Sequence, residues 1–268
     1  MITNQETAIR AIVASSINGY ASGFSDRHLS EVNSPTGVIN MKIHNIFIAA
    51  LGSDIQYYSA LARSLDSSLG NMLENMAIQI ARLNYIVNQY VDGYIYEEQT
   101  SNIARLLEEY KRHTKKPSIN DYSNLTTCIN NNRINKRHDS DYYLFDEKNN
   151  IHHLIELKIG GDLDNKKARS EKEAILEQYC ILKNNLGNNA NIKIHFATAY
   201  NRYGEGNPWT QSRVLQFFSQ DELLISRDFW NMICCSENGY DIVIDEYEKN
   251  AHTIIDALER IKNAYLQE

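Results

Sequence analysis

The chain has 268 residues, of which 43% are hydrophobic and 23% are charged. These proportions are ordinary for a globular protein, and they exclude a wholly disordered, fibrous or low-complexity chain. The formal net charge of -7 excludes a surface that is basic throughout, so contact with nucleic acid would require a local basic face. We expect one domain over residues 1–268, because a chain of this length can bury a substantial core.

The N-terminal segment has no cationic leader before an apolar block, and its longest apolar run is Ala11–Ala14. Neither a signal peptide nor a membrane anchor is expected, which predicts a cytoplasmic location. The cysteines form no CxxC pair and no ligand spacing with His, so a zinc site or a disulfide framework is not expected. They are Cys128, Cys180, Cys234 and Cys235.

Apolar residues recur every three or four positions from about Ser68 to Tyr94, which predicts one long amphipathic helix. These positions are Met72, Leu73, Met76, Ile80, Leu83, Val87 and Tyr90. A second helix is expected to start at Thr100 or Ser101, either of which can cap it, and to end before Pro117. Residues 1–117 are therefore expected to be the mainly helical part.

Residues 118–138 are rich in Asn, Ser and Thr without periodicity, which predicts a long surface connection. Seven cations lie between Lys111 and His138 against a single acid, Asp121. Such a stretch can contact phosphates, although it is equally compatible with an ordinary solvated surface. The candidates for phosphate contacts are Lys115, Lys116, Arg133, Lys136 and Arg137.

Two apolar runs, Tyr142–Phe145 and Ile151–Ile159, flank a polar turn and predict an antiparallel hairpin. Helical spacing returns over Lys166–Leu186, and alternation over Asn191–Tyr200 predicts another strand beside the hairpin after a helical crossover. Residues 118–200 are thus expected to form the core of an α/β fold, a mixed central sheet flanked by helices. Residues 201–268 are expected to be a helical C-terminal part. Its helices are predicted at Pro208–Phe218, Ser226–Cys235 and Tyr240–Leu266.

Glu156 and Lys158 occupy alternate positions of the second predicted strand, so their side chains share one face while Ile155 and Leu157 point into the core. Asp141 opens the partner strand and can lie beside Glu156. Paired carboxylates suit a hard divalent cation such as Mg²⁺, and a neighbouring lysine can orient a water or help to deprotonate it. Metal-assisted hydrolysis of a phosphodiester requires this arrangement.

At these residues the sequence resembles a known family. The residues similar to the PD-(D/E)XK nuclease signature are Asp141, Glu156, Leu157 and Lys158. The segments that resemble type II restriction endonucleases, of the TdeIII-like group, are Ser68–Glu74, Glu156–Lys167 and Asp228–Asn231. The resemblance implies a restriction-endonuclease-like fold and Mg²⁺-dependent cleavage of duplex DNA at a short palindrome. It also implies a homodimer whose two sites each cut one strand.

Several assignments stay open. Asp139 competes with Asp141 as a metal ligand, and Asp141 is favoured because it immediately precedes the apolar run. Glu74 lies on a predicted helix where the resemblance implies an additional acid, although a solvated helix surface explains it as well. Lys166 and Lys167 begin the helix after the catalytic strand and can face the DNA backbone. Candidates in the polar stretch after the third strand, where base edges could be read, are Arg202, Asn207 and Arg213.

Two other functions remain compatible with the sequence. One is a structure-specific repair or recombination nuclease with the same core. The other is a non-catalytic helical interaction protein in which the Glu-x-Lys strand is accidental. The first interpretation, a type II restriction endonuclease, also leads us to expect a companion DNA methyltransferase that is not a binding partner.

Overall fold

The computed structural model describes residues 3–126, 132–160 and 165–266, without the side chains of Asp141 and Asn165. Cys128 and residues 161–164, which entered the sequence arguments, lie outside the described residues. The chain divides into two compact units, Met1–Ile80 with Asp241–Glu268, and Ala81–Tyr240. None of the described helices is long and apolar enough to cross a membrane. The expectation of a single domain stays a prediction.

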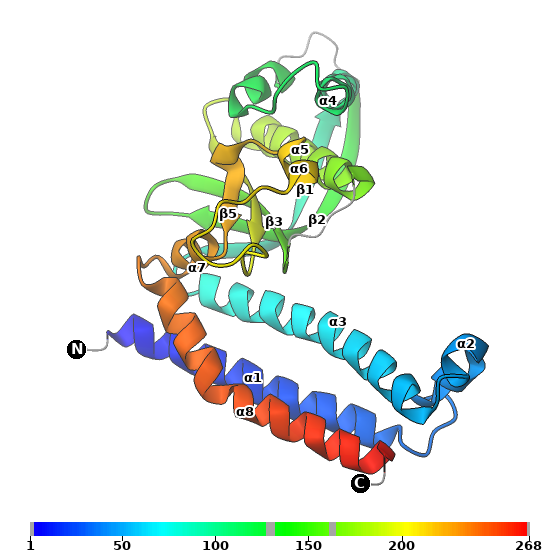
Figure 1. The fold of residues 1–268 in the computed structure, drawn as a ribbon. Coiled ribbons are helices and arrows are strands. Elements are labelled where there is room, and N and C mark those ends of the chain that lie inside the picture. Colours follow the sequence, from blue (N-terminus) through cyan, green and yellow to red (C-terminus); the bar gives the residue numbers. More distant parts are fainter. Residues whose placement is uncertain (1–2, 127–131, 161–164, 267–268) are drawn as a thin grey trace. The chain divides into compact units, whose positions relative to one another are not determined.

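The first unit is helical. Its long helices are α1 (Asn4–Ser30), most of α3 (Ser53–Ala81) and most of α8 (Gly239–Leu266). Two short helices, η1 (Asn40–His44) and α2 (Ile46–Ala49), connect α1 to α3. Figure 1 shows α1 and α8, in blue and red, side by side.

Polar contacts join α1 and α8 near both ends. Arg10 forms ion pairs with Asp245 (2.5 Å) and Glu246 (3.1 Å), and the Tyr265 hydroxyl donates a hydrogen bond to the His28 carbonyl oxygen (3.0 Å). Because the low-numbered and high-numbered ends match, the two helices run parallel. The apolar core of this unit includes Phe24, Ile39, Tyr57, Ala60, Leu61 and Ile261.

The second unit contains a five-stranded sheet in the order β1-β2-β3-β4-β5. The strands are β1 (Ile86–Tyr96), β2 (Arg133–Asp146), β3 (Ile151–Lys158), β4 (Asn191–Thr198) and β5 (Leu223–Ile225). The first three are antiparallel neighbours, whereas β4 runs parallel to both β3 and β5. The predicted hairpin, crossover and mixed sheet are therefore confirmed.

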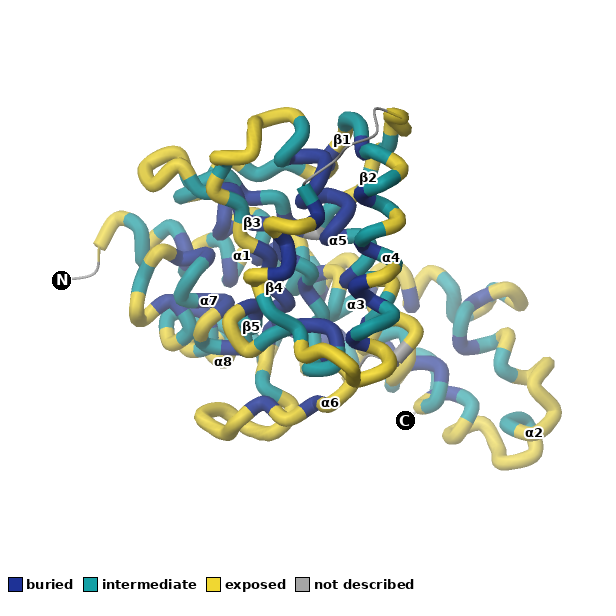
Figure 2. Tube along the Cα trace, turned by 90° about the horizontal axis from the view of Figure 1, so that it is seen from above, coloured by how far each residue is buried: buried dark blue, intermediate teal, exposed yellow. Residues whose placement is uncertain are grey.

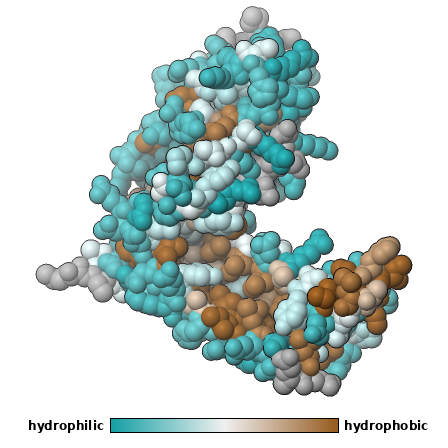
Figure 3. Space-filling model, in the orientation of Figure 1, coloured by the Kyte–Doolittle hydropathy of each residue, from teal (hydrophilic) through white to brown (hydrophobic). Residues whose placement is uncertain are grey.

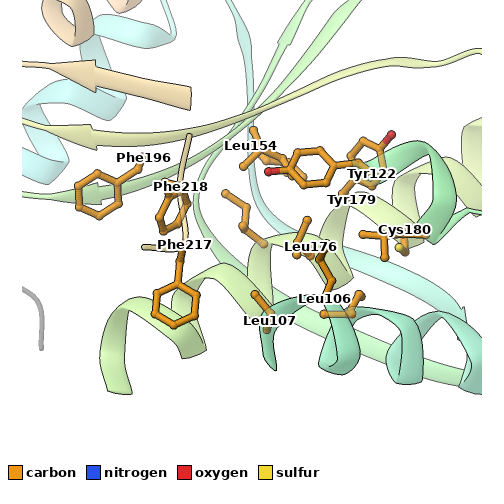
Figure 4. Close-up of a cluster of buried hydrophobic side chains, with 14 of the residues drawn as sticks. Leu106, Leu107, Tyr122, Leu154, Leu176, Tyr179, Cys180, Phe196, Phe217 and Phe218 are labelled. Atoms are coloured by element: carbon orange, nitrogen blue, oxygen red, sulfur yellow. The ribbon is translucent and has the colours of Figure 1, made fainter. Parts of the chain in front are cut away.

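Six helices accompany the sheet in the described part of the second unit. They are α4 (Glu97–Lys111), η2 (Ile119–Leu125), α5 (Asn165–Leu186), α6 (Ser212–Leu215), η3 (Gln220–Glu222) and α7 (Arg227–Cys234). The crossover helix α5 contacts β1, β3 and β4. Buried side chains of α4, α5 and β3 form the core in Figure 4, and most of β3 is coloured as buried in Figure 2.

One predicted helix is wrong over its second half. Helix α3 ends at Ala81, and Ile86–Tyr96 form strand β1 instead of the last turns of a helix to Tyr94. Val87, Val91 and Ile95 recur every four positions, a spacing that fits a helix and one face of a strand equally well. The stretch is rich in β-branched and aromatic residues and pairs with β2, so sheet formation prevails.

Two further predictions need correction. The surface connection does not extend to residue 138, because β2 begins at Arg133 and carries Lys136 and Arg137 into pairing with β1. Polar residues dominate this part of the strand, so the sequence lacked the apolar alternation that marks a half-buried strand. The helix predicted over Pro208–Phe218 shortens to α6, and Phe217 and Phe218, which follow it, are buried in the core with residues of α5.

Candidate active site

The carboxyl end of β3 carries the predicted catalytic pair. Ile155 and Leu157 are buried, whereas Glu156 and Lys158 alternate with them and remain partly exposed. The Lys158 ammonium forms an ion pair with Glu156 (Nζ–Oε1, 2.5 Å). Parallel pairing sets Lys158 beside Thr198 at the end of β4. Ligands of open α/β sheets bind outside the carboxyl ends of parallel strands, so the pair lies where a substrate can reach it.

A second carboxylate reaches the same lysine from helix α5. Glu171 Oε1 lies 3.3 Å from Lys158 Nζ. The next residue, Lys172, is fully buried and forms an ion pair with Glu222 (2.5 Å) and a hydrogen bond to the Tyr122 hydroxyl (2.6 Å). This buried contact fixes the turn of α5 that presents Glu171.

Glu171 was missed in the sequence. It has no spacing relation to the Glu-x-Lys motif, and only the path of the crossover helix brings it to the strand end. The one indication of Glu171 in the sequence is its position in the helix that follows the catalytic strand. A helix that directly follows a strand keeps its first turns near that strand's carboxyl end, so an acid in those turns is a candidate for the site.

The strand that carries Asp141 is irregular at that residue. In the β1–β2 ladder Asn88 pairs with Tyr143 and Tyr90 pairs with Asp139, so three residues of β2 lie opposite one residue of β1. Extra residues of this kind bend a strand and are common next to active sites. The β2–β3 ladder begins with Tyr142 opposite Ile155. The backbones of Asp141 and Glu156 therefore adjoin the same end of this ladder.

Asp139 and Glu74 are the other predicted acids. Asp139 is 96% exposed, its carboxylate is 4.0 Å from Arg137, and it precedes the β2–β3 ladder by three residues. Glu74 belongs to α3 of the first unit, so its role as an additional acid stays a prediction. The choice between Asp139 and Asp141 as metal ligand also stays a prediction, because the Asp141 side chain is outside the described part.

The donor set fits a hard divalent cation. Glu156 brings a carboxylate to the end of β3 next to the backbone of Asp141, and carboxylate oxygen is the ligand that such cations prefer. Among the side chains that the structure describes, no three His, Cys, Asp or Glu residues lie together as a metal site. Asp141, the expected second ligand, does not enter that comparison.

A family model for the type II restriction endonuclease HinfI matches residues 4–251. The chain belongs to the HinfI type II restriction endonuclease family. It is a site-specific deoxyribonuclease with a restriction-endonuclease-like α/β fold, and members of such families usually need a divalent metal ion. This excludes the non-catalytic alternative, while the TdeIII-like subgroup stays a prediction. No curated protein and no solved structure matches the chain significantly.

Several basic residues of this HinfI-family chain are held by protein groups. Glu177 accepts an ion pair from Lys136 (2.7 Å) and from His138 (2.8 Å). Burial raises the pKa of Glu177, but the hydrogen bonds from His138 and Lys136 outweigh it, and the pKa is lowered. Lys115 is similarly paired with Asp121 (2.6 Å). A carboxylate that neutralises a cation weakens its pull on a phosphate.

Aromatic rings hold two more of the predicted cations. The Arg133 guanidinium lies over Tyr94 (4.5 Å to the ring centroid) and the Arg137 guanidinium over Tyr90 (3.9 Å). Both arginines are exposed on β2 and both rings belong to β1. Cation–π contact orients a guanidinium without neutralising it. Arg137 also lies 4.0 Å from the exposed Asp139 carboxylate, and such a pair in water is weak, so both arginines remain able to meet phosphates.

Two adjoining pockets are lined by further cations. One, of about 700 Å³, is lined by Lys111, His113, Lys166, Arg169, Ser170 and Glu173 among others. The other, of about 560 Å³, includes Lys115 and Lys116 and shares His113 and Gln216 with the first. Residues 166, 169, 170 and 173 follow helical spacing, so they form one face of α5. Lys167 lies in the same first turn.

The loop after β4 is internally bonded. The Asn207 amide donates to the Tyr203 carbonyl (2.6 Å), and Glu205 accepts from the Ser226 hydroxyl (2.6 Å) and pairs with Arg227 (3.4 Å). The first of these bonds gives Asn207 a role in shaping the loop. Arg202 lies 6.0 Å from the Tyr203 ring, and Arg213 is on α6. Base readout by Arg202, Asn207 and Arg213 stays a prediction.

Proposed function

We propose that this restriction endonuclease cuts both strands of duplex DNA at a short palindrome in a Mg²⁺-dependent reaction of the PD-(D/E)XK type. The observation that carries the proposal is the Glu156–Lys158 ion pair at the end of β3, with the irregular Asp141 segment of β2 beside it. The pair supplies a metal-binding carboxylate and a cation on a rigid strand.

The residues have distinct roles in this reaction. Asp141 and Glu156 would hold Mg²⁺, with Asp139 as the alternative to Asp141 and Glu74 as an additional acid. When bound, the metal lowers the pKa of a coordinated water and neutralises charge on the phosphate. Lys158 orients the attacking water and stabilises charge that develops on the phosphate oxygens. Glu171 positions Lys158 and does not itself touch the reacting atoms.

Basic side chains bind the phosphates of the DNA, and a two-fold dimer matches its palindromic sequence. Phosphates meet the cations of the two pockets, above all Lys116, Lys166 and Arg169, with Lys167, Arg133 and Arg137 as further contacts. Lys115 and Lys136 belong to the predicted set but are already paired with carboxylates. A palindrome presents identical half-sites, which a two-fold homodimer matches.

The test is cleavage of plasmid DNA by variants of the full chain. Lys158→Ala and Glu156→Gln should each lower the rate by several orders of magnitude while the circular dichroism spectrum stays unchanged, since catalytic groups that act as a unit are each indispensable. Lys193→Ala is the matched control, because it removes an exposed lysine from the neighbouring strand β4. Near-normal cutting by Lys158→Ala would refute the assignment.

Metal dependence completes this test. Discrete fragments should appear with Mg²⁺ or Mn²⁺, whereas Ca²⁺ should support DNA binding without hydrolysis. Excess EDTA should stop cutting by the wild-type chain. Full activity in EDTA, or cutting confined to junctions and flaps, contradicts the proposed reaction.

A further inference from the structure

An exposed apolar surface lies on the first unit and contains none of the residues assigned to cleavage. It consists of Ile43, Ile46, Phe47, Leu51 and Ile55, here called the α2 patch. Their exposure ranges from 45% for Ile55 to 79% for Phe47. Figure 3 shows the hydrophobic side chains gathered over α2. Soluble proteins seldom expose large apolar side chains in a cluster, so the patch indicates a binding surface.

The backbone beneath the α2 patch is ordered by side-chain hydrogen bonds. Asn45 caps α2 by accepting from the amides of Phe47 (3.2 Å) and Ile48 (3.3 Å). Asn40 donates to three carbonyl oxygens of the preceding turn, and Gln56 donates to the Ala49 carbonyl (3.4 Å). The apolar side chains are therefore presented by a structured platform.

We propose that the α2 patch is the face on which a second copy of this chain docks as a two-fold dimer. Residues 43–55 contain a single charged side chain, Asp54, and no Lys or Arg. DNA would require cations here, and helices that lie on membrane surfaces usually have a basic polar face. In a two-fold contact the patch meets itself, and the five apolar side chains carry no charge that would repel its copy.

The area of the α2 patch is sufficient for a second copy of the chain to dock on it. Five side chains that expose on the order of 100 Å² each, adjoined by Met41 and Tyr58, supply most of the roughly 800 Å² per partner that a stable interface buries. A pocket of about 500 Å³ shares Ile43 with the patch, and its mixed polar and apolar lining includes Ile39, Tyr57 and Leu266. Each copy thus offers both projecting side chains and a recess, and two-fold symmetry can match them reciprocally.

The proposal names the surface for the homodimer of the proposed function, and its test needs neither DNA nor metal. Sedimentation equilibrium of the full chain at micromolar concentration should give the mass of two chains. Phe47→Glu and Ile46→Lys should each give the mass of one chain with an unchanged circular dichroism spectrum. Ile255→Glu, which charges an exposed isoleucine of α8 outside the patch, is the matched control and should remain dimeric.

Three results would overturn the inference. In the first, the wild-type chain sediments as one copy. In the second, the Phe47→Glu variant stays dimeric. In the third, the wild-type chain binds phosphatidylcholine vesicles and the Phe47→Glu variant does not. The last would assign the patch to a lipid surface. Lys158→Ala should be inactive yet dimeric, so failure of the dimer surface and failure of the cleavage mechanism are distinguishable.

Discussion

Lys158 holds one positive charge between the carboxylates of Glu156 and Glu171, at 2.5 Å and 3.3 Å. The two acids have different consequences. Glu156 shares the strand with Lys158 and can also serve the metal, whereas Glu171 reaches over from α5. A lysine stem is flexible, so a second carboxylate reduces the volume that its ammonium samples.

We predict that Glu171→Gln lowers kcat about tenfold, the loss that corresponds to about 1.4 kcal/mol of one charged contact. Glu171→Asp should fall between the wild-type chain and Glu171→Gln. Glu173→Gln, on the same helix but lining the basic pocket, should not lower kcat. The measurement is single-turnover cleavage at saturating enzyme.

A double-mutant cycle separates positioning from a general loss of stability. If Glu171 acts through Lys158, the combination of Glu171→Gln with Lys158→Ala should be no slower than Lys158→Ala alone. Fully additive losses would show that Glu171 acts independently of the lysine.

The sequence predicted this site in part. Glu156 and Lys158 could be paired because strand alternation alone sets their common face, and the structure has them in contact. Glu171 could not be found in this way, since its approach depends on how α5 packs against the sheet. The ion pair between Lys136 and Glu177 could not be predicted either, because the two residues are 41 positions apart in the sequence.

The secondary-structure elements also divide into those that a local sequence pattern predicts and those that depend on pairing with a distant segment. Strands β3 and β4 and helices α5 and α8 were predictable because each has one unambiguous period. Strand β1 was not, since its four-residue apolar spacing fits two periods and the choice depends on pairing with β2, far along the chain. The polar half of β2 has no apolar alternation, so only its pairing with β1 identifies it as a strand.

We also predict that the exposed face of α5 contacts DNA phosphates. Lys166→Ala and Arg169→Ala should weaken binding about equally for target and non-target duplexes, and each should flatten the salt dependence by about one unit of log–log slope. Binding isotherms at several salt concentrations with Ca²⁺ measure both quantities.

Lys136→Ala is the informative comparison for α5. Its ammonium is held by buried Glu177, so its loss should lower the melting temperature and leave the salt slope nearly unchanged. A slope change equal to that of Lys166→Ala would return Lys136 to the phosphate contacts. Unchanged slopes for Lys166→Ala and Arg169→Ala would make the α5 face an ordinary solvated surface.

The stability of the whole chain should depend on pH through two buried imidazoles. His153 and His195 lie side by side on β3 and β4, with Nδ1 and Nε2 3.1 Å apart. Burial lowers the pKa of His153 to about 4 and that of His195 to about 3. Between the unfolded value near 6.5 and these values the unfolded chain binds more protons, so stability falls as the pH falls.

We predict that the free energy of unfolding drops by up to about 1.4 kcal/mol per pH unit for each histidine between pH 6.5 and about 4. His153→Phe removes one of the two groups, so it should reduce the slope by about that amount. His252→Gln, at an exposed position of α8, should leave the slope unchanged. Urea unfolding at several pH values measures it, and an identical slope for His153→Phe would contradict the assignment.

The extra residues of β2 also determine which insertions and deletions the sheet tolerates. The sheet spans the interval from Asn88 to Tyr90 with one residue on β1 and three on β2. Losing one codon here would turn over every side chain on one side of the change and expose buried positions such as Leu144. Losing two would leave an uninterrupted ladder with its faces unchanged. Insertions and deletions among relatives should therefore occur in pairs at Ser140–Tyr142, and a lineage that dropped such a pair could keep the sheet while losing its carboxylate.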